Sequence, residues 1–237
     1  MATFLQLCAD LARESGAIGT PPASVTGPLS RRQAQCVGWI RGAWLAIQNH
    51  TPDWKFLRAE FDAQLVAGQK SYTAAELLGA AAPRFAEWAQ QRPGVPIMSI
   101  YDAAIGRKDE QFIRQLDYDR WRQSFDFGVH DSTRPTYWAI GYDESLKFGQ
   151  TPDKAYRVRG EYRKTPQVLA ADNDVPEMPA RFHDAIWQRA IMLMAESDEA
   201  VQSFQTAQFE YGISLGNMVR DLLPDFTMNE GGAVDRR

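Results

Sequence analysis

The side chains that most often do chemistry are present in this chain, but their spacing fits no familiar reaction centre. The histidines His50, His130 and His183 occur in no His-x-x-x-His or cysteine-rich pattern, so the sequence predicts no metal site. No Gly-x-Ser-x-Gly turn is present to expose a nucleophilic serine. Neither a dinucleotide fingerprint nor a phosphate-binding loop occurs. We therefore expect no cofactor and no enzymatic activity.

Carboxylates leave one catalytic alternative open. Two acidic side chains that face each other across a cleft can hydrolyse a glycan, provided that one of them has a raised pKa. The chain has 30 Asp and Glu residues, which makes chance pairs common, so a solvated acidic surface is the preferred interpretation. A glycan hydrolase remains the less favoured alternative. Its candidate carboxylates are Glu60, Asp62, Asp117, Asp119, Asp126, Asp143 and Glu144.

An alternating segment from Lys154 to Tyr162 predicts a strand with one packed face and one wet face. Tyr, Val and Gly occupy one face, while Arg157, Arg159 and Arg163 share the other with Glu161. These three arginines form a candidate contact for an acidic partner, although a solvated sheet face is the simpler interpretation. They are too few to indicate nucleic-acid binding, and the net charge of −4 gives no general attraction to DNA.

Composition places the chain among ordinary globular proteins. Its 237 residues, 44% of them hydrophobic, suffice for one large domain or two small ones. Cys8 and Cys36 are only two and both lie in segments that resemble helices, which indicates neither a disulfide framework nor a zinc site, and we expect two small buried side chains in a reducing compartment. No signal peptide and no apolar run near 18 residues is visible, so we expect neither export nor a membrane span.

The clearest periodic signal lies near the C-terminus. A heptad stripe predicts a helix that packs along one side, and a second apolar stripe predicts a partner helix from Pro179 to Ala195. The connector Glu196-Ser197-Asp198 is short enough for an antiparallel helical hairpin. The heptad stripe consists of Val201, Phe204, Gln208, Tyr211, Leu215, Met218 and Leu222.

The helices of this chain carry more apolar faces than a two-helix hairpin needs. Trp187, Ile191, Met194, Phe209, Ile213 and Val219 lie off the shared seam. The helix that follows the capping box Ser30-Arg31-Arg32-Gln33 also has a second apolar stripe, which includes Trp39. These extra faces predict a third surface, supplied either by the N-terminal helices or by another subunit.

The pattern of elements predicts an α+β protein. We expect a helical bundle of two N-terminal and two long C-terminal helices, with an inserted antiparallel β layer. The bundle takes residues 1–53 and 179–223, the inserted and mainly β domain takes 54–178, and 224–237 form a flexible tail. Within the insertion, Pro83 to Gln90 resembles a short helix, and residues 97–105 and 111–116 resemble a strand pair.

The order of short motifs resembles the head-to-tail adaptor proteins of tailed bacteriophages over nearly the whole chain. The N-terminal part of the match is Phe4-Leu5-Gln6-Leu7, Pro22-Ala23-Ser24-Val25-Thr26-Gly27 and the segment from Trp39 to Asp53-Trp54-Lys55-Phe56-Leu57. The later part is Pro135-Thr136-Tyr137, Thr151-Pro152-Asp153, Tyr156-Arg157-Val158, Tyr162, Met178-Pro179 and Phe182-His183.

The resemblance implies a structural virion protein without a cofactor. Such adaptors form rings, commonly of twelve copies, between the portal protein and the tail proteins of the nozzle or fibres, and they continue the channel for genomic DNA. We expect DNA to pass without specific binding, no membrane contact, a place at the neck of the virion, and assembly in the host cytoplasm. Another tail ring component, such as a terminator or nozzle subunit, is the alternative.

The resemblance also implies where the subunit and portal contacts lie. We place them on the C-terminal hairpin, on the tail and on the second stripe of the N-terminal helix, and we expect monomers before the portal is met. The candidate interface residues are Trp39, Trp187, Ile191, Phe204, Phe209, Tyr211, Met218, Leu222 and Phe226.

Overall fold

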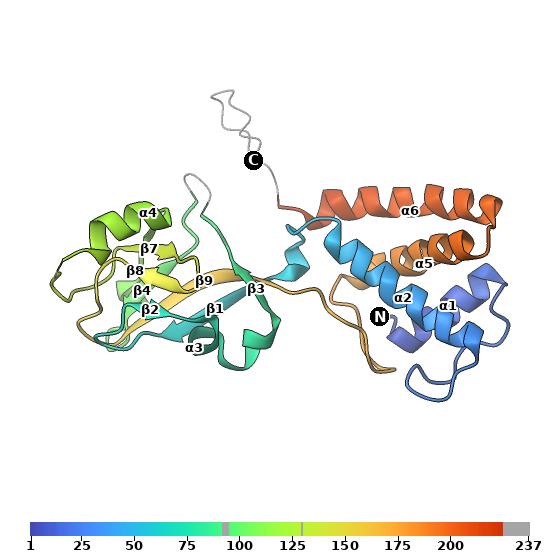
Figure 1. Ribbon diagram of the computed structural model, residues 1–237, viewed down its shortest axis with the longest axis horizontal. Helices are drawn as coiled ribbons and strands as arrows, with labels where there is room; N and C mark the ends of the chain where they lie inside the picture. The colour runs from blue at the N-terminus through green and yellow to red at the C-terminus, as the bar shows by residue number, and fades with distance from the viewer. Residues whose placement is uncertain (92–94, 129, 225–237) are drawn as a thin grey trace, which may run out of the picture. The chain divides into compact units, whose positions relative to one another are not determined.

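The computed structural model describes residues 1–91, 95–128 and 130–224. The chain divides into two compact units, coloured along the sequence in Figure 1. The helical unit combines Met1–Leu57 with the chain from Pro166 onward, and the inserted unit is Arg58–Thr165. Helices and sheets are segregated in this way, so the protein is of the α+β class. The predicted tail lies almost entirely outside the described residues.

The helical unit is built from α1 (Phe4–Ser15), α2 (Arg31–Asn49), α5 (Asp184–Ser197) and α6 (Val201–Leu222). The capping box predicted at Ser30 is confirmed: its hydroxyl accepts from the Gln33 backbone, and the Gln33 side chain accepts from the Ser30 backbone. Thr3 caps α1 through the same arrangement with Gln6. Both boxes satisfy backbone N–H groups that a helix N-terminus leaves unpaired, which fixes where each helix begins.

Helix α5 is the centre of the helical unit, since it packs against α1, α2 and α6 (Figure 1). Trp44 on α2 and Trp54 after it are almost fully buried, and the ring of Phe56 stacks between them with centroids 5.7 Å from each. Cys8 and Cys36 are also buried where α1 meets α2, and the Cys36 thiol lies 3.5 Å from the Cys8 carbonyl. The burial of both side chains was predicted from the sequence, and the thiols are free.

The helical unit also holds residues 54–57 and 166–178, which the sequence assigned to the inserted part. Hydrogen bonds explain this. The Trp54 indole donates to the Ile47 carbonyl at 2.8 Å, and the Arg41 guanidinium donates to the Leu169 carbonyl at 2.8 Å. Gln48 exchanges two further bonds with the Gln167 backbone, at 3.0 and 2.6 Å. The bonds of Arg41 and Gln48 join α2 to residues 119 to 128 positions later, so a window of sequence does not reveal them.

His183 fastens the N-terminus of the chain to the start of α5. The side chain is only 2% exposed; its Nδ1 accepts from the Ala2 backbone at 3.1 Å, and its Nε2 lies 3.0 Å from the Met178 carbonyl. The bond from Ala2 needs an unprotonated Nδ1, so the ring is neutral with its proton on Nε2. Burial lowers the pKa of His183, and the nearby N-terminal amine lowers it further. The residue is therefore structural, and its neutral form is the folded form.

We expect the helical unit to lose stability as the pH falls from 7 to 5. The folded pKa of His183 lies below that of the unfolded chain, so its contribution is complete above about 6.5 and is lost as the pH falls towards the folded value. Between the two pKa values the loss is about 1.4 kcal/mol for each pH unit. Denaturant titrations of the wild type and of His183→Gln would show it. An equal pH slope in both proteins would contradict this assignment.

The inserted unit contains two sheets. Its strands are β1 (Arg58–Gln64), β2 (Ser71–Tyr72), β3 (Phe85–Trp88), β4 (Ser99–Asp102), β5 (Gln111–Phe112), β6 (Arg114–Gln115), β7 (Tyr137–Ile140), β8 (Leu146–Phe148) and β9 (Tyr156–Lys164). Two short helices accompany them, α3 (Ala74–Leu78) and α4 (Tyr118–Trp121), which a π turn extends to Asp126. Asp117 caps α4, because its carboxylate accepts from the Arg120 backbone.

Strand β9 is the central strand of the larger sheet, whose order is β1-β9-β4-β5. β1 covers one edge of β9 over residues 157–163, while β4 and β3 follow each other along the opposite edge. The predicted alternation of β9 is confirmed, since Tyr156, Val158 and Tyr162 are buried and the arginines between them are not. This sheet therefore presents one packed face and one polar face.

Two details of the insertion differ from the sequence prediction. The β part is not one antiparallel layer, because a second sheet of order β2-β8-β7-β6 contains a parallel pair, β6 with β7. A crossover through α4 separates these two strands and makes the parallel pairing possible. Residues 85–88 form β3 and not a helix. A register shift between Phe85 and Glu87 allows Phe85 and Trp88, three residues apart, to pack together at 4.7 Å, which resembles helical spacing.

Candidate functional site

The α5–α6 hairpin is the first candidate surface. A tight turn joins the helices, and Glu199 in this turn has a left-handed backbone with a φ of 56°. Arg32 of α2 holds this turn through a bidentate ion pair with Asp198, in which one of the two bonds measures 3.0 Å. That bond lowers the pKa of Asp198 and raises the pKa of Arg32. The hairpin therefore has one fixed orientation on α2.

The predicted interface residues fall into four groups. Met218 and Leu222 lie inside the core of the helical unit, so their side chains are not available to a partner; the heptad stripe uses them to pack α6 internally. Phe226 lies outside the described residues. Phe209 is 73% exposed. The remaining candidates are half-buried at the rim of the core, and they are Trp39, Trp187, Ile191, Phe204 and Tyr211.

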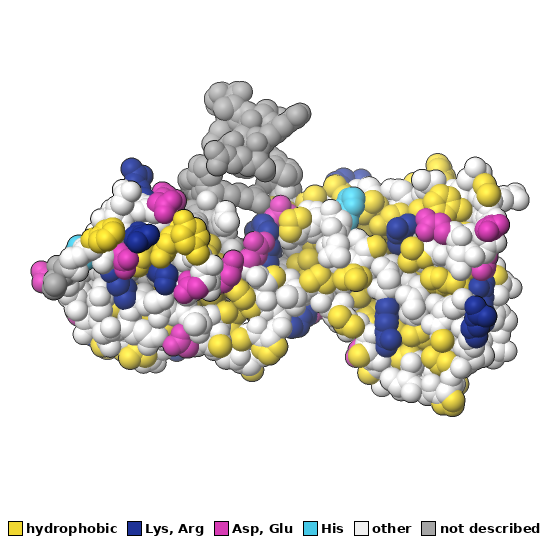
Figure 2. Space-filling model, in the orientation of Figure 1, with side chains coloured by type: hydrophobic (Ala, Val, Ile, Leu, Met, Phe, Trp, Pro, Cys, Tyr) yellow, Lys and Arg dark blue, Asp and Glu magenta, His cyan; other side chains and the backbone are white. Residues whose placement is uncertain are grey.

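One face of α6 is exposed and carries large apolar side chains among uncharged polar ones. Phe209 is at its centre, with Ile213 at 54% and Val201 at 68% exposure along the same helix. Between Val201 and Val219 the only charged residue of α6 is Glu210. Figure 2 shows hydrophobic side chains on the surface of this helix. Exposed aromatic and aliphatic side chains with few charges are typical of the core of a protein–protein interface.

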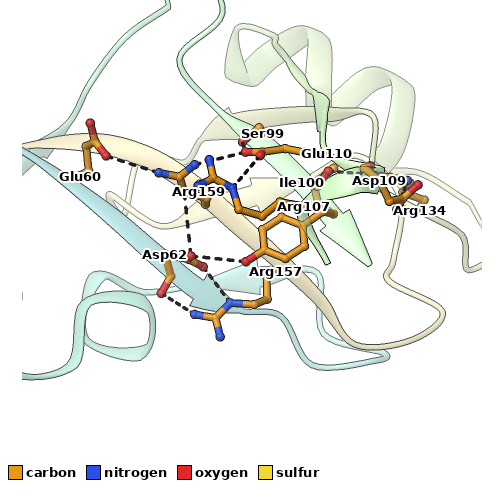
Figure 3. Close-up of polar contacts among 11 residues, drawn as sticks. Glu60, Asp62, Ser99, Ile100, Arg107, Asp109, Glu110, Arg134, Arg157 and Arg159 are labelled. Carbon is orange, nitrogen blue, oxygen red and sulfur yellow. Dashed lines mark hydrogen bonds and ion pairs between the residues drawn. The ribbon is translucent and has the colours of Figure 1, made fainter. Parts of the chain in front are cut away.

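The polar face of β9 is the second candidate surface, and the chain already supplies acidic partners for it (Figure 3). Arg157 donates to Asp62 at 2.8 Å, and this contact raises the pKa of Arg157. Arg159 lies 3.5 Å from Glu60, 3.9 Å from Asp62 and 3.5 Å from Glu110. Arg163 pairs with Glu87 on β3. A contact between these arginines and an acidic protein stays a prediction, and it would have to displace these pairs.

The sequence analysis named Glu60 and Asp62 only as candidates for glycan hydrolysis, and it missed both their pairing with the arginines and the carboxylates Glu87 and Glu110. Asp62 stands directly opposite Arg159 in the β1–β9 register, and Glu110 also accepts from Ser99 at 2.6 Å, which lowers the pKa of Glu110. A signal for β1 was present, since acidic residues recur at positions 60 and 62 of a weakly alternating segment. Nothing local indicated that this segment pairs with β9, almost a hundred residues later.

The carboxylates proposed for glycan hydrolysis have structural roles. Asp119 accepts from the Tyr142 hydroxyl at 3.2 Å, and Asp143 accepts from Ser145 at 2.7 Å, which lowers the pKa of Asp143. Lys154 likewise lowers the pKa of Asp102. Every carboxyl of the described residues with a clearly shifted pKa has it lowered, whereas a general acid needs a raised one. Those carboxyls are Glu76, Asp102, Glu110, Asp143, Asp174 and Asp198.

A wide surface cavity of about 630 Å³ in the inserted unit brings several polar side chains together. Two of its three acidic side chains have partners elsewhere, since Asp117 caps α4 and Glu87 pairs with Arg163; the third is Glu144. Among residues 1–91, 95–128 and 130–224, no group of three or more potential ligands is gathered for a metal ion. In the same described ranges, no helix has the length and apolar character that crossing a membrane requires.

Comparison with known proteins shows which family the chain belongs to. A sequence model described as SU10 adaptor protein matches residues 2–227, which takes in both units. No curated protein matches the chain. The match agrees with the resemblance that the order of the motifs indicated, and a structural role for both candidate surfaces is consistent with it. The chain therefore belongs to the SU10 adaptor protein family, the phage head-to-tail adaptors.

Proposed function

We propose that this protein forms a ring between the portal and the tail of a phage particle and continues the channel through which DNA leaves. Family membership makes it a virion-associated structural adaptor. The observation that carries the finer proposal is the set of exposed apolar side chains on α6 around Phe209, which the described residues of the protomer leave uncovered. Ring neighbours and the portal are the partners that this face serves. The net charge of −4 suits a channel wall that does not retain DNA.

Replacing Phe209 by glutamate tests the role of α6. The side chain is 73% exposed, so the variant folds with an unchanged melting temperature. Assembly would bury an unpaired charge, and each 1.4 kcal/mol lost at a contact is about a tenfold loss of affinity. We expect loading onto purified portal rings to fall at least about tenfold, measured by co-sedimentation.

Phe112→Glu is the matched control, because Phe112 is 69% exposed and lies on β5 in the other unit. It introduces the same charge at similar exposure and leaves portal loading unchanged. Equal loading of the Phe209 variant and the wild type would refute the assignment of α6.

Electron microscopy of purified particles then separates the adaptor from a terminator or nozzle subunit, since only the adaptor ring contacts the portal directly.

A further inference from the structure

The helical unit has a second apolar feature, a small cavity between α2 and the segment Gln167–Leu169. It measures about 160 Å³, and its lining includes Gly42 and Leu45 of α2 together with Val168 and Leu169. Leu45 is 45% exposed and Val168 is 74% exposed, so the cavity opens to solvent between apolar walls. An apolar cavity of roughly 150 Å³ accommodates a benzene ring. The cavity is thus large enough for one aromatic side chain.

Phe209 projects from α6 as an aromatic side chain of matching size. Gly212 and Gly216 follow it at helical spacing, and a Cβ placed on either glycine would have no atom within 4 Å. The protomer therefore does not need glycine at these positions, although glycine costs about 1 kcal/mol in a helix interior compared with alanine. Because Gly212 and Gly216 carry no side chains, the helix surface beside Phe209 leaves room for another backbone to approach closely.

Phe209 and the cavity belong to different faces of one compact unit. α5 packs against both α2 and α6, and in Figure 1 α6 runs along the top of the helical unit while the chain that follows β9 runs below it. The projecting side chain and the cavity therefore cannot meet within one copy. A projection on one face and a cavity on another can meet between copies, which gives a head-to-tail contact that closes into a ring under a suitable rotation.

The charges beside the two features are complementary. Glu210 follows Phe209 on α6, and Arg41 lines the cavity. Arg41 donates to the Leu169 and Ala170 carbonyls at 2.8 and 3.4 Å. Within the described ranges no ion pair within 4.0 Å joins Arg41 or Glu210 to another side chain. Opposite charges at the rim of an apolar contact favour one register of the two surfaces.

We propose that Phe209 of one copy inserts into the Gly42–Leu169 cavity of the next copy, with Glu210 beside Arg41. A second copy of this chain is the occupant, and the contact repeats around the ring. This inference rests on the proposed ring function and specifies which surfaces of the protomer form it.

Cysteine cross-linking on assembled rings tests the proposal. The full-length double variant Phe209→Cys with Val168→Cys is loaded onto portal rings and oxidised with diamide, which takes up the two thiol hydrogens as the disulfide forms. Both positions are exposed, so folding is preserved, and the native Cys8 and Cys36 are buried. On a non-reducing gel we expect a ladder of dimers, trimers and higher multiples. The single variants and the wild type give no ladder.

Each other outcome rejects the proposal. Dimers from Phe209→Cys alone would show that α6 packs against α6 of another copy. Normal loading of the double variant without a ladder would show that another partner, such as the portal itself, covers Phe209; the ring function would then stand and this contact would fall. Failure of the wild type to load would reject the ring function, and this inference with it.

Discussion

Replacing Trp54 by alanine is expected to destabilise the helical unit by about 4 kcal/mol. The side chain is fully buried, and its ring stacks on Phe56, which in turn stacks on Trp44 of α2. Truncation removes one end of this stack and leaves a cavity that the surrounding helices fill only in part. It also leaves the Ile47 carbonyl near the end of α2 without the indole donor. Folded domains have stabilities of about 5–15 kcal/mol, so this single change approaches the limit that the unit can bear.

Trp54→Phe is the control for this prediction, because it keeps an aromatic ring and removes only the indole hydrogen bond and part of the volume. Its expected cost is about 1.5 kcal/mol. Denaturant titration followed by amide hydrogen exchange distinguishes the units: protection should fall in residues 31–57 and 184–222 and stay unchanged in β1 and β9. A loss below about 1 kcal/mol for Trp54→Ala would show that Trp54 does not hold this core together.

Local signals in the sequence predicted the features that depend on neighbouring residues. Ser30 and Gln33 form a capping box because the residues that satisfy each other are three positions apart. The alternation along β9 depends only on the period of a strand. The hairpin of α5 and α6 needs only a short connector between two apolar stripes. Each of these predictions is confirmed.

Features that depend on distant residues could not be predicted in this way. Residues 166–178 were assigned to the inserted domain, since nothing in their own segment shows that Arg41 and Gln48 of α2 bind their backbone. The parallel pairing of β6 with β7 and the register shift in β3 depend on which strand becomes the neighbour. The resemblance of the whole chain to a family carried information of that kind, whereas the spacing of residues did not.

The two candidate surfaces show the same difference between features that local sequence predicts and features that depend on distant residues. The heptad stripe predicted that α6 is amphipathic, but the period cannot say which apolar residues the protomer covers. Met218 and Leu222 turned inward, while Phe209 and Ile213, which are off the stripe, remain exposed. On β9 the position of Arg157 and Arg159 on the wet face was predicted correctly, and their pairing with Asp62 required the register of β1. Periodicity thus predicts which face of a helix or strand is exposed. The residues that pair with that face can be identified only from the fold.

Replacing Gly160 by valine is expected to destabilise the inserted unit by about 3 kcal/mol, although valine favours strands. Gly160 stands opposite Phe61 in the β1–β9 register. A Cβ at Gly160 would lie 2.8 Å from Cε1 of Phe61, 3.1 Å from its Cζ and 3.2 Å from Cε of Met98. The Phe61 ring cannot easily move away, because it packs edge-on against the buried Trp88 at 5.2 Å. Overpacking therefore outweighs the gain in β-propensity, which is at most about 1 kcal/mol.

A double-mutant cycle separates steric overlap from any other effect at this position. Phe61→Ala alone creates a cavity and costs about 3 kcal/mol or more. In the double variant the valine methyl groups occupy part of that cavity, so its total cost is below the sum of the single costs by at least about 1 kcal/mol. Denaturant titration gives the three values, and hydrogen exchange should report lost protection in β1, β4 and β9, since β9 is their common neighbour. Strict additivity, or a Gly160→Val protein as stable as the wild type, would show that the close approach of Phe61 is not what requires glycine at the centre of this sheet.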